Sequence, residues 1–261
     1  MTKVIRRKNQ RERFRWYLKP NKEMETEIKG NEMLSDLTIN CAQLILHRQF
    51  PLKEGFEDTE CGLHKTFTVR KNAFIQILFS HGHWVTVAAE DEKEVHIFDS
   101  LSRPKGICRE TILRQICNLR QSNSSNIRVF TKPVQQQTNG IECGLYSIAF
   151  AVELAHGYSP VKSNFNQSKM REHLWNCLKN EIFTPFPKTE KRIKRCDQII
   201  SFLSLYCTCR DTFFTDDPDN DPGLFMIQCL SCQEWYHKRC EKVKVKWFKS
   251  NSQEWKCSLC R

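Results

Sequence analysis

The feature that most constrains the fold of this 261-residue chain is a series of paired cysteine and histidine residues in its last quarter. The pairs have the spacings C-x-C, C-x2-C, H-x2-C and C-x2-C, and their members are Cys207, Cys209, Cys229, Cys232, His237, Cys240, Cys257 and Cys260. Thiolate and imidazole groups at such spacings bind zinc in tetrahedral sites, so the series predicts two zinc ions with no ligand left over. A segment this short and this poor in aliphatic residues cannot bury enough apolar surface to fold alone, so we expect the metal to be structural.

A disulfide framework is the alternative interpretation of these cysteines. It does not account for His237 in the ligand series, and the sequence shows no secretory signal. Of the 14 cysteines, those outside the series and away from the candidate active site show no pairing pattern, as is typical of free thiols in a reducing compartment. These are Cys41, Cys61, Cys108, Cys117, Cys177 and Cys196.

The ligand order of four cysteines, one histidine and three cysteines resembles that of PHD fingers. The resemblance implies interleaved sites, one made by Cys207, Cys209, His237 and Cys240 and the other by Cys229, Cys232, Cys257 and Cys260. RING-variant ubiquitin ligases share this order. Trp255, two residues before the seventh ligand, and the tight C-x-C opening favour a PHD finger, which we place over residues 205–261.

Some PHD fingers bind methylated lysine, and this segment has matching residues. Tyr206, Met226 and Trp235 stand at the positions that form an aromatic cage in the family's methyl-lysine readers, where cation–π attraction holds a trimethylammonium group. The acidic stretch 215–223 could face a basic peptide. The resemblance therefore implies a methylated histone tail as a partner. The alternative is that the rings only shield the zinc sites and that the acidic stretch is a solvated turn.

A second set of candidate functional residues lies in QQQTNGIECG, residues 135–144. Cys143 directly precedes an apolar run, 145–152, with the spacing of one helix face. A cysteine at the start of a helix meets unpaired N–H groups and the positive end of the dipole, which favour a thiolate. Gln137 could direct its amide N–H at an oxyanion. The alternative is a buried structural cysteine that begins a core helix.

The segment before this motif reads as a β-hairpin with a histidine and an aspartate at its ends. Its strands are expected over 84–89 and 94–98, because apolar and β-branched residues alternate there around a charged turn. His83 precedes the first strand and Asp99 follows the second, so antiparallel pairing would place them side by side. A carboxylate in that position holds an imidazole in the tautomer that a nucleophile requires.

In order and context, these residues resemble the SUMO and ubiquitin-like-protein proteases and their adenain relatives. The resemblance implies an α+β fold of the papain-like, SUMO-protease type over residues 31–185. It implies Cys143 as nucleophile, His83 as general base and acid, Asp99 as the group that orients His83, and Gln137 in the oxyanion hole. A ubiquitin-like modifier of the SUMO or NEDD8 class, or its conjugates, is the substrate that follows from it.

Two positions depart from the family pattern. Glu142 stands before the nucleophile where the family usually has aspartate. Met33 stands where SUMO proteases place a tryptophan that, with the one matching Trp84, closes a tunnel over the substrate's diglycine. We therefore expect a looser tunnel, with Met33 and Trp84 as substrate-binding residues. Bacterial acetyltransferases share the fold and a Cys/His pair, but usually carry glutamate at the position of Asp99.

Periodicity and breakers divide the rest of the chain. We expect a basic N-terminal arm over residues 1–30, a linker over 186–204, and a loop over 51–68 that flanks the active site. Helices are expected over 36–49, 109–121 and 168–181, the first capped by Ser35 or Asp36, and a strand over 127–130. No apolar run reaches the length that spans a bilayer, so a membrane is not an expected partner.

The formal net charge of +11 is unevenly distributed. Residues 1–22 and 188–195 form two basic clusters. Such clusters occur in nuclear import signals and in arms that contact nucleic-acid phosphates, and also as solvated tails or helix faces. Beside a chromatin-reading finger, nuclear localisation is the more economical interpretation, and nucleic acid becomes a further candidate partner.

The sequence as a whole predicts a cysteine peptidase or isopeptidase that acts on a ubiquitin-like modifier and is brought to chromatin by a PHD finger. One alternative is a chromatin-binding protein whose peptidase domain is silent and serves only for contacts. Another is a transposon-encoded protein with a different substrate, because some DNA transposons combine this peptidase type with a PHD finger. A ubiquitin ligase is the third, and Trp255 speaks against it.

Overall fold

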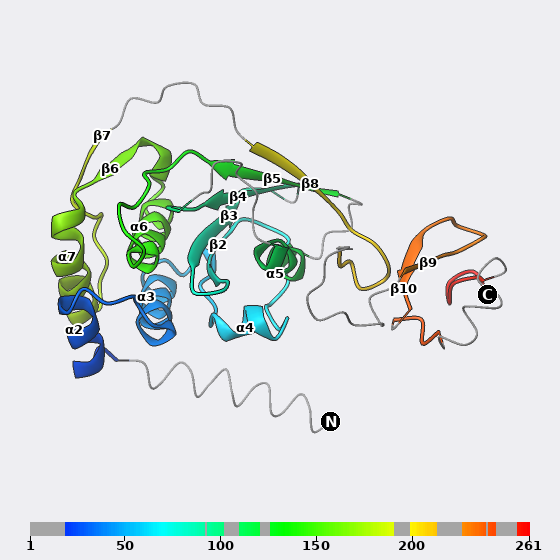
Figure 1. Cartoon of the computed structure of the whole chain (residues 1–261), viewed down its shortest axis with the longest axis horizontal. Helices are drawn as coiled ribbons and strands as arrows, with labels where there is room; N and C mark the ends of the chain where they lie inside the picture. The colour runs from blue at the N-terminus through cyan, green and yellow to red at the C-terminus, as the bar shows by residue number, and fades with distance from the viewer. Residues whose placement is uncertain are drawn as a thin grey trace.

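The computed structural model describes residues 19–91, 93–101, 110–120, 126–190, 199–212, 226–238, 240–243 and 255–261. Its larger part is a six-stranded mixed sheet with helices on both faces, and a two-stranded unit carries the cysteine-rich end of the chain (Figure 1). The mixed α+β class predicted from the sequence is confirmed.

The sheet has the strand order β1-β2-β3-β4-β5-β8. The strands are β1 Glu54–Gly55, β2 Phe74–Phe79, β3 Trp84–Ala89, β4 Glu94–Phe98, β5 Asn126–Lys132 and β8 Ile199–Ser204. Strands β2, β3 and β4 run antiparallel, β1 is parallel to β2, β4 is parallel to β5, and β8 is antiparallel to β5. The hairpin predicted over 84–98 is confirmed as β3 and β4.

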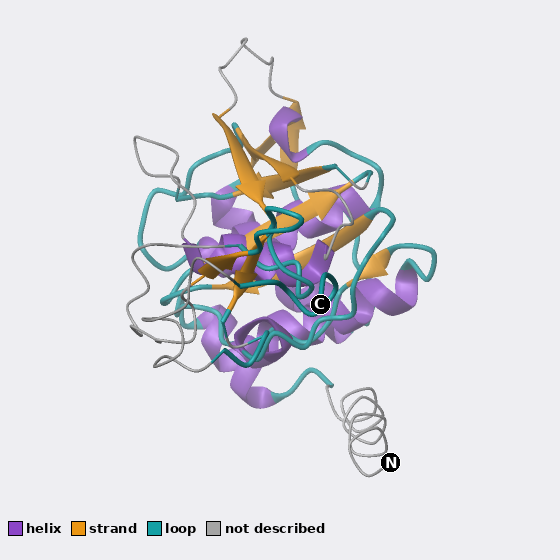
Figure 2. Ribbon diagram, turned by 90° about the vertical axis from the view of Figure 1, so that its right-hand side faces the viewer, coloured by secondary structure: helices purple, strands orange, loops and turns teal. Residues whose placement is uncertain are grey.

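Both faces of the sheet are apolar, because alternate residues of a strand point to opposite faces. In β2, Ile75 and Ile77 belong to one buried cluster and Phe74 and Leu78 to the other. The first cluster is shared by the helices α2 Lys22–Lys29, α3 Asp36–Gln49, α6 Cys143–Ala155 and α7 Gln167–Lys179. The second is covered by α4 Glu60–Leu63 and α5 Glu110–Arg120 (Figure 1), and Figure 2 shows helices packed around the sheet.

The predicted helices form with small differences at their ends. Ser35 caps α3 by accepting a hydrogen bond from the Thr38 N–H at 3.5 Å, as expected for a serine at this position. The expectation for α6 was incomplete, because the sequence pattern indicated one apolar face. Tyr146 and Phe150, outside that face, are also fully buried, since α6 is enclosed by the sheet, α3 and α7.

The last third of the basic arm expected over residues 1–30 is a helix that belongs to the larger domain. Met24 and Ile28 of α2 are buried, and α2 packs against α7. Asn21 caps this helix by accepting a hydrogen bond from the Met24 N–H at 2.9 Å. The two apolar residues, one helical turn apart, attach α2 to the domain, and this pair was the available signal in the sequence. Residues 1–18 lie outside the described part of the chain.

The prediction of a linker over 186–204 is wrong at both of its ends. Phe186 is buried in the first cluster, and β7 Lys188–Glu190 pairs with β6 Ser163–Phe165, which follows the short 3-10 helix η1 Pro160–Lys162. At the other end, β8 adds a strand to the sheet and buries Leu203 against the second cluster. The sheet edge at β5 has unpaired backbone groups that β8 satisfies, which explains why this short apolar run is a strand.

The cysteine-rich end is built on β9 Met226–Gln228 and β10 Trp235–His237, which pair antiparallel. Tyr236 and Trp255 pack at its centre together with ligand cysteines. The acidic stretch 215–223 lies outside the described residues, as do Cys108 and Cys196. No helix in the described ranges is both long and apolar enough to cross a lipid bilayer.

Candidate active site and metal clusters

The candidate nucleophile is the first residue of α6. Cys143 is 1% exposed and opens α6, where the first backbone N–H groups of a helix have no partner within the helix. The residue before it, Glu142, makes no side-chain capping bond to the helix. The positive end of the α6 dipole is therefore available to stabilise negative charge on the Cys143 sulfur.

His83 and Asp99 meet as the hairpin geometry predicted. His83 precedes β3 and Asp99 follows β4, and the His83 Nε2 lies 2.7 Å from the Asp99 Oδ1. Burial alone would lower the pKa of His83, but hydrogen bonds to Asp99 and Cys143 and the negative charge of both outweigh it and raise the pKa to about 9. Because Asp99 occupies Nε2, Nδ1 is the ring nitrogen left to face Cys143.

Gln137 is held by a residue that the sequence interpretation missed. The Ser100 hydroxyl donates a hydrogen bond to the Gln137 Oε1 at 2.7 Å. The Ser100 backbone carbonyl accepts a hydrogen bond from the Gln137 N–H at 2.8 Å. A hydroxyl donor on Oε1 fixes which end of the amide carries its hydrogens. The Gln137 Nε2 donates one of them to the Asn139 carbonyl at 2.5 Å, which leaves a second N–H for a ligand. The position of Ser100 directly after Asp99 was the available signal.

The residue after the nucleophile must be small. A Cβ at Gly144 would lie 2.9 Å from the Leu34 Cβ and 3.1 Å from the Trp84 Cδ1. Trp84 is buried, and its Nε1 donates a hydrogen bond to the Leu34 carbonyl at 2.9 Å. Met33, the neighbour of Leu34, is 40% exposed. The structure therefore brings the segment before α3 beside Cys143, while substrate binding by Met33 and Trp84 stays a prediction.

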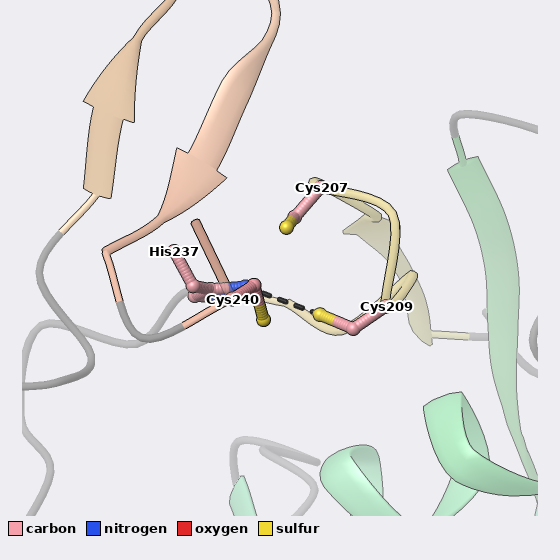
Figure 3. Close-up of side chains that lie close together, drawn as sticks. All are labelled: Cys207, Cys209, His237 and Cys240. Carbon is pink, nitrogen blue, oxygen red and sulfur yellow. Dashed lines mark hydrogen bonds between the residues drawn. The ribbon is translucent and has the colours of Figure 1, made fainter. Parts of the chain in front are cut away.

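Two groups of cysteine and histidine residues in the C-terminal unit could hold metal ions. They are Cys207, Cys209, His237 and Cys240, shown in Figure 3, and Cys229, Cys232, Cys257 and Cys260. Within each group the ligand atoms lie within 4.8 Å of one another, in the interleaved pairing that the sequence resemblance implied.

The donor atoms fit zinc. The Sγ atoms of Cys232 and Cys257 are 3.9 Å apart, close to the distance of about 3.8 Å between two sulfurs bound tetrahedrally to one zinc ion. The buried His237 Nε2 has no hydrogen-bond partner among the described residues, and its Nδ1 faces the Cys209 sulfur at 3.2 Å. A ring that directs one nitrogen at a cluster of thiols has the orientation of a metal ligand.

Two of the predicted cage residues lie on β9 and β10, and the third, Tyr206, lies beside β10. The Cys207 N–H donates to the Trp235 carbonyl at 2.9 Å, which places Tyr206 beside β10. Met226 pairs with His237 across β9 and β10, two residues from Trp235. Trp235 is 42% exposed, whereas Tyr206 and Met226 are half-buried. An exposed indole beside two half-buried side chains is compatible with a cation-binding surface.

Comparison with known proteins gave two family matches. The Ulp1 protease family, C-terminal catalytic domain, matches residues 47–189, and the UBR7-like PHD finger matches residues 201–261. The NEDD8-specific protease 1 of Schizosaccharomyces pombe is 31% identical over 112 residues, which are 38% of this chain and 26% of that protein. The chain thus covers about a quarter of the length of this curated relative.

Solved structures show a similar fold. The SUMO protease Ulp1 with its catalytic cysteine oxidised to a sulfinic acid has a TM-score of 0.51 at 14% identity, covering 64% of this chain and 86% of that one. The C-terminal Ulp1 protease domain in complex with Smt3, the yeast ortholog of SUMO, has a TM-score of 0.48 at 13% identity, covering 66% and 93%. At such identities the first likeness establishes the fold alone.

Proposed function

Because this chain belongs to the Ulp1 protease family and carries a UBR7-like PHD finger, we propose that it is a cysteine isopeptidase that cleaves a ubiquitin-like modifier of the SUMO or NEDD8 class from its conjugates or precursors. The observation that carries the proposal is the placement of His83, which bonds to Asp99 at 2.7 Å and whose pKa is raised by Asp99 and by Cys143, the first residue of α6. The likeness to a NEDD8-specific protease supports this class of substrate.

The proposed reaction begins with the proton on His83. Since the pKa of His83 is about 9, the imidazole is protonated at neutral pH, and the proposed nucleophile is the thiolate form of Cys143. The thiolate attacks the carbonyl carbon of the modifier's last residue, and the oxyanion that forms accepts hydrogen bonds from the Gln137 amide and the Cys143 N–H. His83 then gives its proton to the departing amine, which breaks the C–N bond and leaves a thioester.

Hydrolysis of the thioester restores the enzyme. Neutral His83, oriented by Asp99, takes a proton from water while the water oxygen attacks the thioester carbonyl. The C–S bond breaks, the modifier leaves with a free carboxylate, and the Cys143 thiolate again faces protonated His83. His83 thus carries the proton given to the amine and the one taken from water, while the second proton of the water stays on the new carboxyl group and is released to solvent when that group ionises.

For the PHD finger we propose two structural zinc ions, one for each cluster of four ligands. The metals cross-link segments that are 25 to 33 residues apart in the chain and replace the apolar core that so small a unit lacks. We further propose that Tyr206, Met226 and Trp235 bind a methylated lysine of a histone tail and that the protein acts in the nucleus. An enzyme held on chromatin in this way would meet nearby conjugates at a raised effective concentration.

The peptidase proposal is tested with reactive probes that carry an electrophile at the carboxy terminus of SUMO, NEDD8 or ubiquitin. Wild-type protein is expected to form a covalent adduct with the SUMO or the NEDD8 probe, and Cys143→Ala to form none. If no probe reacts while iodoacetamide still labels Cys143 at neutral pH, the thiolate is active toward a different substrate, and the proposed substrate class is wrong.

The histone proposal is tested by titrating trimethyl-lysine, dimethyl-lysine and unmodified histone peptides against the full chain. Trp235→Ala is expected to weaken binding of the methylated peptide by about 1 to 2 kcal/mol, that is roughly five- to thirtyfold. Leu230→Ala is the matched control, because Leu230 is also an exposed apolar residue of the finger and lies outside the proposed cage. Equal binding of methylated and unmodified peptides would contradict the cage.

A further inference from the structure

A buried carboxylate stands directly before the candidate nucleophile. Glu142 is 5% exposed, its backbone carbonyl accepts the first hydrogen bond of α6 from the Tyr146 N–H at 3.0 Å, and its Oε2 has no hydrogen-bond partner among the described residues. An anion at this place would oppose a thiolate on Cys143, since like charges in a poorly solvated site disfavour each other. Its charge therefore needs a counterion.

That counterion is Arg171 of α7. The Arg171 side chain is about 10% exposed, and its Nε donates to the Glu142 Oε1 at 3.1 Å. Its remaining nitrogens donate to backbone carbonyls of the segment that begins in α2, at 3.4 Å to Glu27, 3.1 Å to Ile28 and 2.7 Å to Glu32. One guanidinium thus satisfies the last carbonyls of a helix and an acidic side chain at the same time.

The segment that Arg171 holds is the one beside the nucleophile. Its far end is tied by Glu27, whose carboxylate accepts the Ser35 N–H and the Ser35 hydroxyl, each at 2.7 Å. Between these ties, Leu34 packs over Gly144, and Met33 is exposed. Arg171 therefore joins residues 27–35 to the residue that precedes Cys143.

We propose that the Arg171–Glu142 ion pair is a positioning device of the active site: Arg171 cancels the charge of Glu142 beside the Cys143 thiolate and fixes the segment 27–35 over Cys143 and Gly144. This inference rests on the proposed role of Cys143 as the nucleophile. It also gives a reason for glutamate at position 142, because the carboxylate reaches α7 instead of capping α6.

The charge part of the proposal is tested by the pH profile of alkylation of Cys143 with iodoacetamide, a readout that needs no modifier substrate. Arg171→Met leaves Glu142 unpaired, so we expect alkylation at neutral pH to slow about tenfold and the profile to move to higher pH. Glu142→Gln removes the opposing charge and is expected to move the profile to lower pH. The double variant is expected to return to within about threefold of wild type.

A matched control lies on the same helix. Glu153 of α6 is fully buried, is paired with Lys188 and also has one carboxylate oxygen without a partner. Lys188→Met therefore leaves a buried carboxylate ten residues along α6 from Cys143, about 15 Å away. The alkylation profile of this variant is expected to match that of wild type, which separates the charge at Glu142 from general destabilisation.

The positioning part is tested by steady-state cleavage of the modifier that reacts as a probe. Arg171→Met is expected to raise KM several-fold, because the segment over the site loses three hydrogen bonds, whereas Glu142→Gln keeps these bonds and the wild-type KM. The proposal is overturned if Arg171→Met and Glu142→Gln both slow alkylation, or if neither changes it. Slow alkylation in the double variant, equal to that of Arg171→Met alone, would likewise assign Arg171 a structural role only. If Arg171→Met does not fold, the Glu142→Gln variant tests the proposal: its alkylation profile is expected to move to lower pH, and an unchanged profile would overturn the proposal.

Discussion

Cys143 with His83, at the start of α6, and Cys177 with His173, near the end of α7, are two pairs of the same residue types in one domain. The Cys177 Sγ lies 3.4 Å from the His173 Nε2. Burial alone would raise the pKa of the Cys177 thiol, but hydrogen bonds with His173 and Thr184 outweigh it and lower the pKa. A lowered thiol pKa is a property of reactive cysteines, so Cys177 meets one criterion of a nucleophile.

The two histidines differ in how their nitrogens are used. The same His173 Nε2 that faces Cys177 also lies 3.0 Å from the Thr184 carbonyl oxygen. A carbonyl can only accept, so this nitrogen carries its hydrogen and cannot take one from the thiol. His83 instead bonds Asp99 through Nε2 and keeps Nδ1 for Cys143. In addition, Cys177 lies near the negative end of its helix, and Cys143 lies at the positive end of α6.

The comparison shows that a cysteine beside a histidine does not make a catalytic site. The pair must use separate ring nitrogens for the carboxylate and the thiol, and it must face a donor for the oxyanion. Only the pair at α6 has these features among the described residues, with Asp99 on one side and Gln137 on the other.

The largest expected effect comes from removing each cysteine in turn. Cys143→Ala is expected to lower modifier cleavage by about 10⁴-fold or more, because no group replaces the nucleophile. Cys177→Ala is expected to change cleavage by less than about threefold, since it only leaves a small cavity in α7. Steady-state hydrolysis by both variants, with circular dichroism as a folding control, measures the difference. Equal losses of cleavage activity in the two variants would contradict the assignment of Cys143 as the nucleophile.

The next largest effect is expected from the group that the second pair lacks. Asp99→Asn keeps the size of the side chain but removes the charge that orients and stabilises protonated His83, so kcat is expected to fall about 10²-fold or more. The measurement is kcat and KM over pH 6 to 9. Retention of wild-type kcat across this range would show that Asp99 only supports the hairpin.

The next effect is a pH-dependent contribution of His83 to stability. The folded-state pKa of His83 is raised from 6.5 to about 9, so protonated His83 stabilises the fold. Its contribution, up to about 3 kcal/mol, is complete below about pH 6.5 and is lost as the pH rises through about 9. Denaturant unfolding at pH 6 and pH 9.5 measures the loss. His83→Gln should remove most of this pH dependence, and an unchanged dependence in that variant would contradict the assignment.

The smallest effect on the active site is expected from metal removal. A chelator is expected to unfold the finger, because its apolar centre is small, while probe labelling of Cys143 changes by less than about twofold. Hydrogen exchange read together with labelling tests this. Amides of β9 and β10 should lose protection, and those of β8, which is paired with β5, should keep it. Loss of labelling on chelation would show that the active site depends on the metal.

The sequence was most informative where neighbouring residues determine the structure. Helix α3 and hairpin β3–β4 have the predicted bounds, because their periodicity and caps are local. The interleaved metal clusters also have the membership that the resemblance implied. In each case residue type and spacing within a short window carry the information.

Features that depend on distant partners could not be predicted in this way. Strand β8 exists because β5, more than 60 residues earlier, offers a sheet edge. Arg171 and Glu142 are 29 residues apart, and no local pattern connects them. The i, i+4 spacing of His173 and Cys177, in contrast, is a local signal. What makes them a poor catalytic pair is the hydrogen bond from His173 to the Thr184 carbonyl, and Thr184 lies outside the helix.

The most direct test of Cys143 as the nucleophile is to locate the covalent bond in the adduct with a reactive SUMO or NEDD8 probe. The adduct would be digested and its modified peptide sequenced by tandem mass spectrometry, with the zinc sites kept loaded during labelling. We expect a single thioether-linked probe on Cys143 and an unmodified Cys177. A probe attached to Cys177, or to a cysteine of the finger, would contradict it.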